Sequence, residues 1–416
     1  MKVYLEIYGC TANKGDASLA LGLLKKNNHE TVENINDAEV IILLTCTVIG
    51  TTEQRMLSRL RSFKKTGKRI IVAGCMASIQ PDLIKSVAPD AELLPPQYTH
   101  HIVDILEGNL VSFVDKNKTC FPKYFGEVTA PISISEGCLF SCSYCITSLA
   151  RGKLTSYPID EIVGDVCSAI KQGCKEIQLT AQDTGSYGLD SRQNLGDLLK
   201  HVCQIDGNYR IRVGMMNPHT LLKHPDEIIQ AYSNSKIYKF LHLPVQSGDN
   251  EILQKMIRKY TVSDVIRIID QFRDRYPEIV IATDIIVGFP TETDRQFEHT
   301  VDFLKSVKPD ITNITRYSAR PYTKAKAMRG RIKTEIVKKR SKILTELCSN
   351  LSLENNLNNV GKKYTALITE EGKNNTMVGR AENYKPVVIK EQVNIGEFLP
   401  VIIESAAPTY LVGKLI

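Results

Sequence analysis

The sequence lacks a long hydrophobic run and a secretory leader. Its first ten residues, MKVYLEIYGC, have neither the basic start nor the long apolar core of a signal peptide. The longest apolar stretch, 40–49, is about half as long as a membrane span and contains two threonines. These absences argue against a secreted or membrane protein, so we expect a cytoplasmic chain with no membrane partner.

In a cytoplasmic chain the cysteines are expected to be free thiols and not disulfides. Eleven cysteines without a leader argue against a disulfide framework, because thiols stay reduced in the cytosol. Those thiols are available for metals or catalysis. The 416 residues, with 43% apolar and 24% charged side chains, suit a globular protein of two or three domains, and the net charge of +7 is only mildly basic.

Strand–helix alternation fills residues 1–120, which we assign to an N-terminal domain. Short apolar or β-branched runs followed by helical segments are typical of βαβ units in a parallel α/β sheet. The expected strands are 2–10, 40–46 and 69–75, and the expected helices are 16–26, 53–65 and 81–87. Each of the three strands ends at a cysteine, namely Cys10, Cys46 and Cys75.

A second alternation lies in residues 127–353, and a different pattern follows in 356–416. The second domain has six expected strands, at 132–135, 176–180, 210–214, 240–245, 279–287 and 311–317. Six strand–helix units are too few to close an eight-stranded barrel, so we predict a partial (β/α)6 barrel. The last residues read as five short strands divided by turns, which predicts a small antiparallel β-barrel.

A closely spaced cysteine trio follows the first strand of the second domain. Cys138, Cys142 and Cys145 lie in the segment SEGCLFSCSYC. A 4Fe-4S cluster usually has four thiolate ligands, so three leave one iron free to bind S-adenosylmethionine, which the cluster cleaves by supplying an electron. A zinc site would need a fourth Cys or His at short spacing, and none stands nearby.

The three strand-end cysteines form a second candidate metal site. Cys10, Cys46 and Cys75 are 36 and 29 residues apart, but ligands of open parallel sheets gather beyond the carboxyl ends of the strands. Three neighbouring strands would bring the thiols to one rim, where a second 4Fe-4S cluster fits. The alternative is that they are buried as small hydrophobic residues. We expect no ligand role for Cys120, Cys167, Cys174, Cys203 and Cys348, which have no partner at ligand spacing.

Several segments resemble the radical S-adenosylmethionine methylthiotransferase family. They are YGCTANKGD, LTCTVIGTTEQRM and VAGCMASIQPD in the first domain, and GCLFSCSYCITSLARGKLTSYP and LHLPVQSGDNEILQKMIRKYT in the second. The C-terminal strands are similar to the family's TRAM domain, an RNA-binding module. TANKGD and CTVIGTTEQRM are most similar to the archaeal and eukaryotic branch, which modifies N6-threonylcarbamoyladenosine beside the tRNA anticodon.

The resemblance implies two 4Fe-4S clusters, S-adenosylmethionine, an electron donor and the anticodon loop of tRNA as partners. One S-adenosylmethionine would methylate a sulfur on the auxiliary cluster, and a second, cleaved at the Cys138 cluster, would drive replacement of the adenine C2 hydrogen by a methylthio group. Two alternatives stay open. The same chemistry serves isopentenyladenosine in tRNA or an aspartate of a ribosomal protein, and a non-catalytic iron–sulfur RNA-binding protein would use the clusters for structure.

Seven further residues are expected at the S-adenosylmethionine site. By resemblance, Tyr144 and Gly288 occupy positions that approach the adenine. The others lie on or after strands and would face the barrel mouth, where polar groups can bind the methionine end: Gln182, Asp183, Arg212, Gln246 and Ser247. The alternative for each is a loop cap. His242, inside an apolar strand, is expected to pair with a backbone group.

Two turns depart from the family's usual wording. The family commonly has GFPGET and PRPGT where this chain has GFPTET and ARPYT, so Thr291 and Tyr322 replace glycines. Neither change removes a cluster ligand. The departures therefore concern the loops on the substrate side.

A basic segment joins the second domain to the third. Residues 324–342 contain nine Lys or Arg and one acid, and we expect phosphate contacts there as a clamp on tRNA. The candidates are Lys324, Lys326, Arg329, Arg331, Lys338, Lys339 and Arg340. Tyr364 and Tyr384 are candidates to stack on unpaired bases, or else to fill the core of the small barrel.

Replacing one cysteine of the central trio tests the enzymatic hypothesis. Cys142→Ala removes one of three cluster ligands, so formation of 5′-deoxyadenosine from S-adenosylmethionine should stop in anaerobically reconstituted protein treated with dithionite. The product is quantified by mass spectrometry. Cys120→Ala is the matched control and should retain cleavage. If the parent protein forms no 5′-deoxyadenosine either, the result favours the alternative of a non-catalytic iron–sulfur RNA-binding protein.

Overall fold

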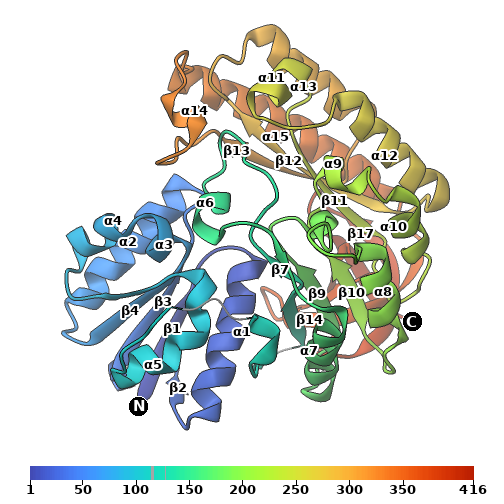
Figure 1. Ribbon diagram of the computed structural model, residues 1–416. Helices are drawn as coiled ribbons and strands as arrows, with labels where there is room; N and C mark the ends of the chain where they lie inside the picture. The colour runs from blue at the N-terminus through green and yellow to red at the C-terminus, as the bar shows by residue number, and fades with distance from the viewer. Residues whose placement is uncertain (114–116, 127) are drawn as a thin grey trace.

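The computed structural model describes residues 1–113, 117–126 and 128–416, so the expected start of the second domain at residue 127 lies outside the described residues. No helix in these ranges is both long and apolar enough to cross a membrane. The N-terminal part is a five-stranded parallel sheet in the order β2-β1-β3-β4-β5 (Figure 1). Its strands are β1 (Lys2–Ile7), β2 (Glu30–Val32), β3 (Val40–Thr45), β4 (Arg69–Gly74) and β5 (Glu92–Leu94). Its helices are α1 (Thr11–Lys26), α2 (Gly50–Lys64), α3 (Cys75–Ile79), α4 (Pro81–Val87) and α5 (Ile102–Glu107).

Strand β3 shows why this sheet forms. All six of its residues are buried, as in a strand covered on both faces. Ile42 and Leu44 pack with residues of α1 and α5, while Ile41 and Leu43 pack with residues of α2. The sequence predicted β1, β3 and β4 but missed the edge strands β2 and β5, because three residues are too few to show a period.

The central domain confirms the prediction of six parallel strands. They are β6 (Thr129–Ser133), β9 (Glu176–Thr180), β10 (Arg210–Val213), β11 (Phe240–Gln246), β12 (Val280–Val287) and β13 (Ile311–Arg316). They form two three-stranded sheets, β10-β9-β6 and β11-β12-β13. The backbone N–H of Met216 donates to the carbonyl of His242 at 2.9 Å across the break between β10 and β11. The barrel is therefore partial, and β13 is an open edge.

Two kinds of side chain alternate along these strands. Ile177, Leu179 and Ile211 belong to the largest hydrophobic core, shared with α7 (Ile159–Lys171), α8 (Leu195–Gln204) and α12 (Val262–Arg275). The intervening positions carry polar groups such as Gln178 and His242. His242 Nε2 lies 2.9 Å from Asp284 Oδ2, so the expected backbone partner was wrong.

The C-terminal domain follows the long helix α15 (Thr334–Leu357). Five strands close a barrel in the order β14-β15-β16-β18-β17. They are β14 (Lys363–Glu371), β15 (Met377–Arg380), β16 (Pro386–Ile389), β17 (Phe398–Ala406) and β18 (Leu411–Leu415). The predicted five strands are confirmed, but the pairing of β16 with β18 is parallel, so the barrel is not antiparallel throughout.

The turn between β15 and β16 docks this barrel onto the central domain. The Tyr384 ring centroid lies 4.9 Å from that of Tyr238 and 4.9 Å from that of Phe240. Its hydroxyl donates to Glu176 Oε1 at 3.2 Å, and Lys385 Nζ lies 2.7 Å from Asp310 Oδ1. Tyr384 is therefore held between two domains and is not available to stack on RNA.

Tyr364 is also unavailable to RNA. It is 9% exposed in the core of the C-terminal barrel, and its hydroxyl donates to Asn359 Oδ1 at 2.6 Å. Tyr364 thus follows the alternative expectation, that it fills the core of the small barrel, whereas Tyr384 packs against Tyr238 and Phe240 of the central domain.

A buried group of four charged residues, which we call the interdomain ion cluster, joins the first domain to the second. It contains Asp16 of α1, Lys118, Glu136 and Arg151, each at most 9% exposed. Lys118 Nζ lies 2.6 Å from Asp16 Oδ1 and 2.6 Å from Glu136 Oε2. Burial favours neutral Glu136, but Lys118 and Arg151 outweigh it and hold the pKa of Glu136 below its usual value. Loss of one member would leave an uncompensated buried charge, at a cost of about 3–5 kcal/mol.

Arg320 makes a second junction between these domains. It is 4% exposed and pairs with Glu53 of α2. Its Nη2 also donates to Thr47 Oγ1 at 3.3 Å and to Gln80 Oε1 at 3.4 Å. Arg320 lies in the segment between β13 (Ile311–Arg316) and α14 (Lys324–Ala327) of the second domain.

Removing the Tyr384 ring should loosen the C-terminal barrel. Tyr384→Ala empties a space among aromatic side chains, and we expect a loss of about 3 kcal/mol from docking. The melting temperature should fall, and the chain should become sensitive to proteases between α15 and β14. Tyr410→Ala, at a half-exposed position of the same barrel, is the matched control. Equal melting temperatures for both variants would contradict this interface.

Candidate active site between two cysteine trios

The central cysteine trio lies in an anchored loop between β7 (Ser135–Glu136) and α6 (Thr147–Arg151). Gly137 enters the loop at φ +74°, where a Cβ would lie 1.9 Å from the carbonyl oxygen of Lys153. Midway, the N–H of Ser143 donates to the carbonyl of Met256 at 3.0 Å. The loop is thus fixed by contacts that only glycine and this backbone path allow.

A half-buried arginine contacts one sulfur of this trio. Arg258 Nη1 donates to Cys142 Sγ at 3.4 Å, and Nη2 donates to the carbonyl of Pro244 at 2.8 Å. Burial raises the pKa of Cys142, an effect that Arg258 opposes, and burial raises the pKa of Cys138 to about 12. Half-buried thiols with such pKa values ionise when a strong cation binds them, so the trio suits a metal cluster.

The structure brings the second trio together as the sequence predicted. Cys10 caps the N-terminus of α1, Cys46 directly follows β3, and Cys75 is the first residue of α3. The strands that precede them, β1, β3 and β4, are neighbours in the sheet. Gly9 packs so closely that a Cβ there would lie 2.9 Å from the Cβ of Cys46. Burial raises the pKa of Cys75 to about 11, and the charges of Cys10 and Cys46 act in the same direction.

The cysteines of neither trio are close enough together to bind one shared metal ion. Among the described residues, no three His, Cys, Asp or Glu side chains are placed to hold one metal ion. An iron–sulfur cubane binds each cysteine through a different iron, so its ligands stand farther apart than those of one zinc ion. The donor set, three sulfurs without carboxylate or histidine, also suits a cluster.

The residues expected at the S-adenosylmethionine site lie mostly at the barrel mouth. Tyr144 is half-buried against Met256 and Phe289. Gln182 follows β9, and its Oε1 is buried with no partner in the described part of the chain. Such an acceptor fits a ligand that donates hydrogen bonds, as the methionine ammonium of S-adenosylmethionine does. Gly288, after β12, has φ +78° and packs against Val337, where a Cβ would lie 2.6 Å from a methyl group.

Two of the other expected cofactor residues, Asp183 and Ser247, accept hydrogen bonds from backbone N–H groups of loops. Asp183 accepts from the N–H of Asn217 at 2.9 Å, and burial raises the pKa of its carboxyl to about 6. Ser247 Oγ accepts from the N–H of Asp249 at 3.2 Å. Gln246, at the end of β11, has a left-handed backbone with φ +77°.

Arg212, which was expected to face the cofactor at the barrel mouth, instead packs against aromatic rings. Its guanidinium carbon lies 5.3 Å from the ring centroid of Phe240 and 5.3 Å from that of Tyr384. The C-terminal domain therefore covers this arginine, and we no longer expect it to contact the cofactor.

The two turns that lack the family's glycines both have left-handed backbones. Thr291 has φ +72° and Tyr322 has φ +62°. A side chain in this conformation costs about 1–2 kcal/mol relative to glycine. Tyr322 is 71% exposed, so its ring gains little from packing.

Six of the seven expected RNA contacts are exposed. Lys324 and Lys326 lie on α14 (Lys324–Ala327), Arg329 and Arg331 on the following loop, and Lys338 and Lys339 on α15. Arg340 is the exception. It is 5% exposed, and its guanidinium lies 2.7 Å from Glu292 Oε2 and 2.7 Å from Asp294 Oδ1. The prediction of an RNA contact was wrong for Arg340, because neighbouring carboxylates occupy it.

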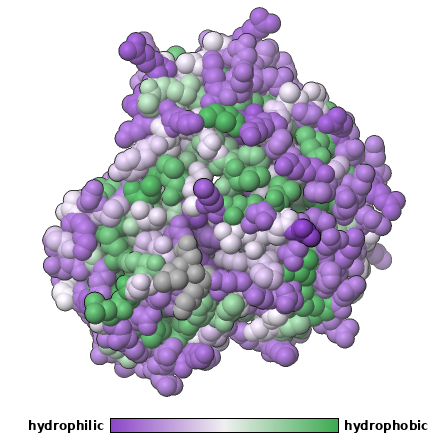
Figure 2. Space-filling view, in the orientation of Figure 1, coloured by the Kyte–Doolittle hydropathy of each residue, from purple (hydrophilic) through white to green (hydrophobic). Residues whose placement is uncertain are grey.

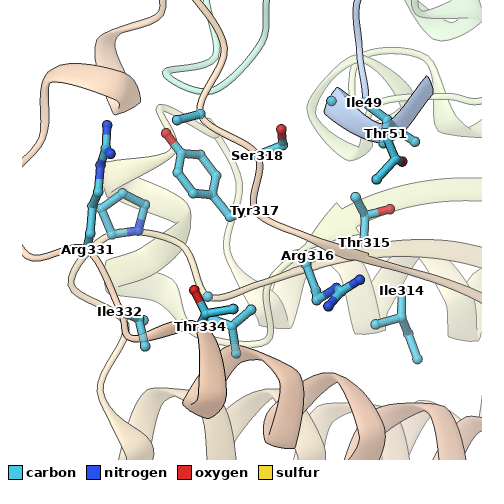
Figure 3. Close-up of a pocket in the computed structure, with 15 residues that line it drawn as sticks. Ile49, Thr51, Ile314, Thr315, Arg316, Tyr317, Ser318, Arg331, Ile332 and Thr334 are labelled. Carbon is cyan, nitrogen blue, oxygen red and sulfur yellow. The ribbon is translucent and has the colours of Figure 1, made fainter. Parts of the chain in front are cut away.

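A cavity of about 550 Å³ opens between the N-terminal and central domains (Figure 3). Ile49 and Thr51 line it from the first domain, and Thr315, Arg316, Tyr317 and Arg331 line it from the second. The Tyr317 hydroxyl is buried and finds no partner among the described residues. Apolar side chains are exposed on this face where the two domains meet (Figure 2).

Segments that belong to both predicted cofactor sites contribute to the lining of the cavity. Its lining residue Ile49 is three residues after Cys46, and Gly288, expected beside the adenine, also lines it. A second cavity of about 550 Å³ includes Arg316, Lys338 and Lys342 in its lining. Arg316 lines both cavities, and the lining of the second also includes Glu346.

Sequence reasoning missed two arginines near the cysteines, the buried Arg151 and the half-buried Arg258. Arg151 and Arg258 lie in the quoted segments SLARGK and MIRKYT, but nothing in their spacing indicates that they reach cysteines. Of the other cysteines, Cys174, Cys203 and Cys348 are buried in the central core. Cys120 is exposed and Cys167 is half-buried.

Three known families match successive parts of the chain. Residues 132–304 match the radical SAM superfamily, residues 358–416 match the TRAM domain, and residues 2–94 match a family described as uncharacterized protein family UPF0004. The radical SAM match spans the Cys138–Cys145 loop.

Solved structures share the fold at low identity. The radical S-adenosylmethionine methyltransferase TsrM from Kitasatospora setae superposes with a TM-score of 0.57 at 13% identity, over 78% of this chain and 76% of that one. The cobalamin-dependent S-adenosylmethionine radical enzyme OxsB gives a TM-score of 0.54 at 12% identity, over 83% of this chain and 56% of that one. These similarities concern the fold alone.

Curated relatives align with the chain from end to end. A probable threonylcarbamoyladenosine tRNA methylthiotransferase of Archaeoglobus fulgidus is 43% identical over 100% of this chain and 99% of that protein. One of Pyrococcus horikoshii is 42% identical over 100% of both. The threonylcarbamoyladenosine tRNA methylthiotransferase of Homo sapiens is 32% identical over 99% of this chain and 74% of its own length. The chain therefore belongs to the family of radical S-adenosylmethionine threonylcarbamoyladenosine tRNA methylthiotransferases.

Proposed function

We propose that this protein converts N6-threonylcarbamoyladenosine beside the tRNA anticodon into its 2-methylthio derivative. The observation that carries the proposal is the pair of cysteine trios, one on each of two domains, with a basic cavity between them. Each trio would hold a 4Fe-4S cluster, and together with S-adenosylmethionine the clusters supply the radical and the methylated sulfur that an unreactive aromatic C–H requires. The proposal includes an electron donor and a cytoplasmic location.

The protein's own residues bind and orient the reactants. The unpartnered Gln182 Oε1 would accept from the cofactor's ammonium, and the backbone at Gly288 would lie beside its adenine. Arg258 contributes a positive charge beside Cys142, which favours the thiolate that binds iron. The Arg320 and Lys118 contacts between the domains fix the cavity in which the target base would lie.

Charge in the cavity favours the threonylcarbamoyl substrate over isopentenyladenosine. The threonylcarbamoyl group carries a carboxylate, whereas the isopentenyl group is an uncharged hydrocarbon. Arg316 and Arg331 line the cavity, and none of its lining residues in the described part of the chain carries a carboxylate. Gly50 and Thr51, the first two residues of α2, also line the cavity, so the positive end of the helix dipole lies at its wall. A buried carboxylate needs such partners, and a hydrocarbon chain would leave them unpaired.

Tyr322 is a further RNA contact in this proposal. Its exposed ring precedes Lys324 and Lys326 of the basic segment, and aromatic rings beside cations are typical of surfaces that hold single-stranded RNA. The left-handed backbone at Tyr322 costs folding energy that glycine would avoid. A base stacked on this ring would contribute about 1–3 kcal/mol and would explain a tyrosine there.

Comparing substrates tests the activity. Reconstituted protein is incubated anaerobically with S-adenosylmethionine, dithionite and tRNA that carries threonylcarbamoyladenosine, isopentenyladenosine or unmodified adenosine. Nucleoside mass spectrometry should find the methylthio product on the threonylcarbamoyl tRNA, with far less on the others. Arg331→Gln should raise KM for that tRNA about tenfold, corresponding to about 1.4 kcal/mol, and Arg275→Gln on α12 is the matched control.

Two outcomes would contradict this proposal. Equal turnover of isopentenyladenosine would move the substrate to the other adenosine. Formation of 5′-deoxyadenosine without any methylthio nucleoside on the three tRNAs would place the substrate outside tRNA.

Substitution of Tyr322 should separate stability from binding. Tyr322→Gly relieves the left-handed strain, so the free energy of unfolding should rise by about 1 kcal/mol, while tRNA affinity should fall several-fold through lost stacking. Tyr322→Phe should bind tRNA as the parent does. Melting curves and filter binding at fixed salt measure the two effects. A glycine variant that gains stability and keeps full affinity would remove Tyr322 from the RNA surface.

A further inference from the structure

Arg151 connects the loop of the central trio to the environment of the other trio. It is the last residue of α6 and lies six residues after Cys145 in the sequence. Its side chain is 2% exposed and enters the N-terminal domain. There Nη2 donates to Asn13 Oδ1 at 2.7 Å and to Asp16 Oδ2 at 2.7 Å, and Nη1 donates to Glu136 Oε1 at 2.7 Å.

The third nitrogen of this guanidinium has no such partner. Arg151 Nε is buried, and no acceptor in the described part of the chain receives its N–H. A buried charged donor without an acceptor costs about 1–3 kcal/mol or more. Arg320 and Arg340 also have a buried Nε without a partner in the described chain, so the position of Arg151 beside Cys75 is what points to a sulfur acceptor. The ion pairs explain Nη1 and Nη2 but leave Nε unexplained.

The surroundings of Arg151 show where an acceptor would lie. Burial raises the pKa of Cys75 and the nearby guanidinium opposes the rise by contact and by charge. Cys10 and Cys75 in turn raise the pKa of Arg151, against burial, which lowers it. Asn13 Oδ1, which accepts from Arg151 Nη2, lies 3.9 Å from Cys75 Sγ. The side-chain amide of Asn13 also donates to the carbonyl of Thr45 at 2.8 Å. The groups around the arginine are therefore those that border the three thiols.

Lys118 provides the comparison within the same ion cluster. It is as deeply buried as Arg151 and contacts the same carboxylates, Asp16 and Glu136. The charges that shift its pKa are those of Asp16, Glu136 and Arg151, with no cysteine among the main causes. A residue needed only to bridge the domains would have the environment of Lys118.

We propose that Arg151 is a positioning residue for the auxiliary iron–sulfur site, where its Nε–H donates to a sulfur of Cys75 or of the bound cluster. The inference rests on the proposed function, since it needs a cluster at Cys10, Cys46 and Cys75. The central domain would then complete the auxiliary site of its neighbour. Arg258, which donates to Cys142 at 3.4 Å, gives the central trio an equivalent contact.

A hydrogen bond from a cation to a cluster sulfur raises the reduction potential, because it stabilises the more negative reduced form. The experiment uses full-length protein carrying Cys138→Ala, Cys142→Ala and Cys145→Ala, so that iron binds only at the auxiliary trio. After anaerobic reconstitution, iron is counted, and the midpoint potential and the EPR spectrum of the reduced cluster are recorded. Arg151→Met, Arg151→Lys and Lys118→Met are compared in this background.

We expect Arg151→Met to shift the potential to more negative values and to change the EPR spectrum. Arg151→Lys, which keeps the charge but lacks the Nε–H, should shift it less. Lys118→Met removes the same charge from the ion cluster without a sulfur contact and should give the smallest shift. Equal shifts for Lys118→Met and Arg151→Met, or no shift for any variant at full iron content, would overturn the role of Arg151.

Loss of iron is also informative. If Arg151→Met loses iron while Lys118→Met keeps it, the arginine helps to hold the cluster, which supports the proposal. If both lose iron equally, Arg151 acts only through the ion pairs, and the proposal fails. If the parent background itself binds no iron, the auxiliary cluster of the proposed function is absent, which is a separate failure.

Discussion

The buried ion cluster of Asp16, Lys118, Glu136 and Arg151 is the constraint on which the site depends. Two thiol trios on different domains can act on one substrate only if the domains keep a fixed separation. Ordinary domain interfaces are polar and permit motion, but four charges buried together cannot part without exposing or unpairing at least one of them. The Arg320 contacts with Glu53 and Thr47 hold the opposite side of the same interface. The cavity between the domains is therefore a fixed space.

Positive charge has three uses around that cavity. Arg258 and Arg151 approach thiols whose pKa values burial raises, and thereby offset the cost of holding anionic sulfur in the protein interior. Arg316 and Arg331 face the substrate space, where a carboxylate on the base would need them. The exposed lysines of α14 and α15 continue the charge outward to where an RNA backbone would lie. Arg340, although part of the same run, pairs with Glu292 and holds α15 against the barrel.

Sequence patterns predicted local features well and tertiary placement poorly. Strand β9 is found at its predicted residues, and the three strand-end cysteines meet because parallel strands in register share one rim. The burial of Tyr384 and the covering of Arg212 could not be predicted, because both follow from the docking of the third domain onto the second. The pairing of His242 with Asp284 joins positions 42 residues apart that only the barrel places side by side. The sequence showed that Thr291 and Tyr322 stand where the family commonly has glycine. The structure adds that both residues have positive φ.

Counting iron tests the central claim, that each trio holds its own 4Fe-4S cluster. Parent protein and two variants, one with Cys10, Cys46 and Cys75 replaced by alanine and one with Cys138, Cys142 and Cys145 replaced, are reconstituted without oxygen and analysed for iron and sulfide, with Mössbauer spectra to identify the cluster type. The account predicts about eight irons per parent chain and about four in each variant. About four irons in the parent, all lost on replacing a single trio, would contradict it.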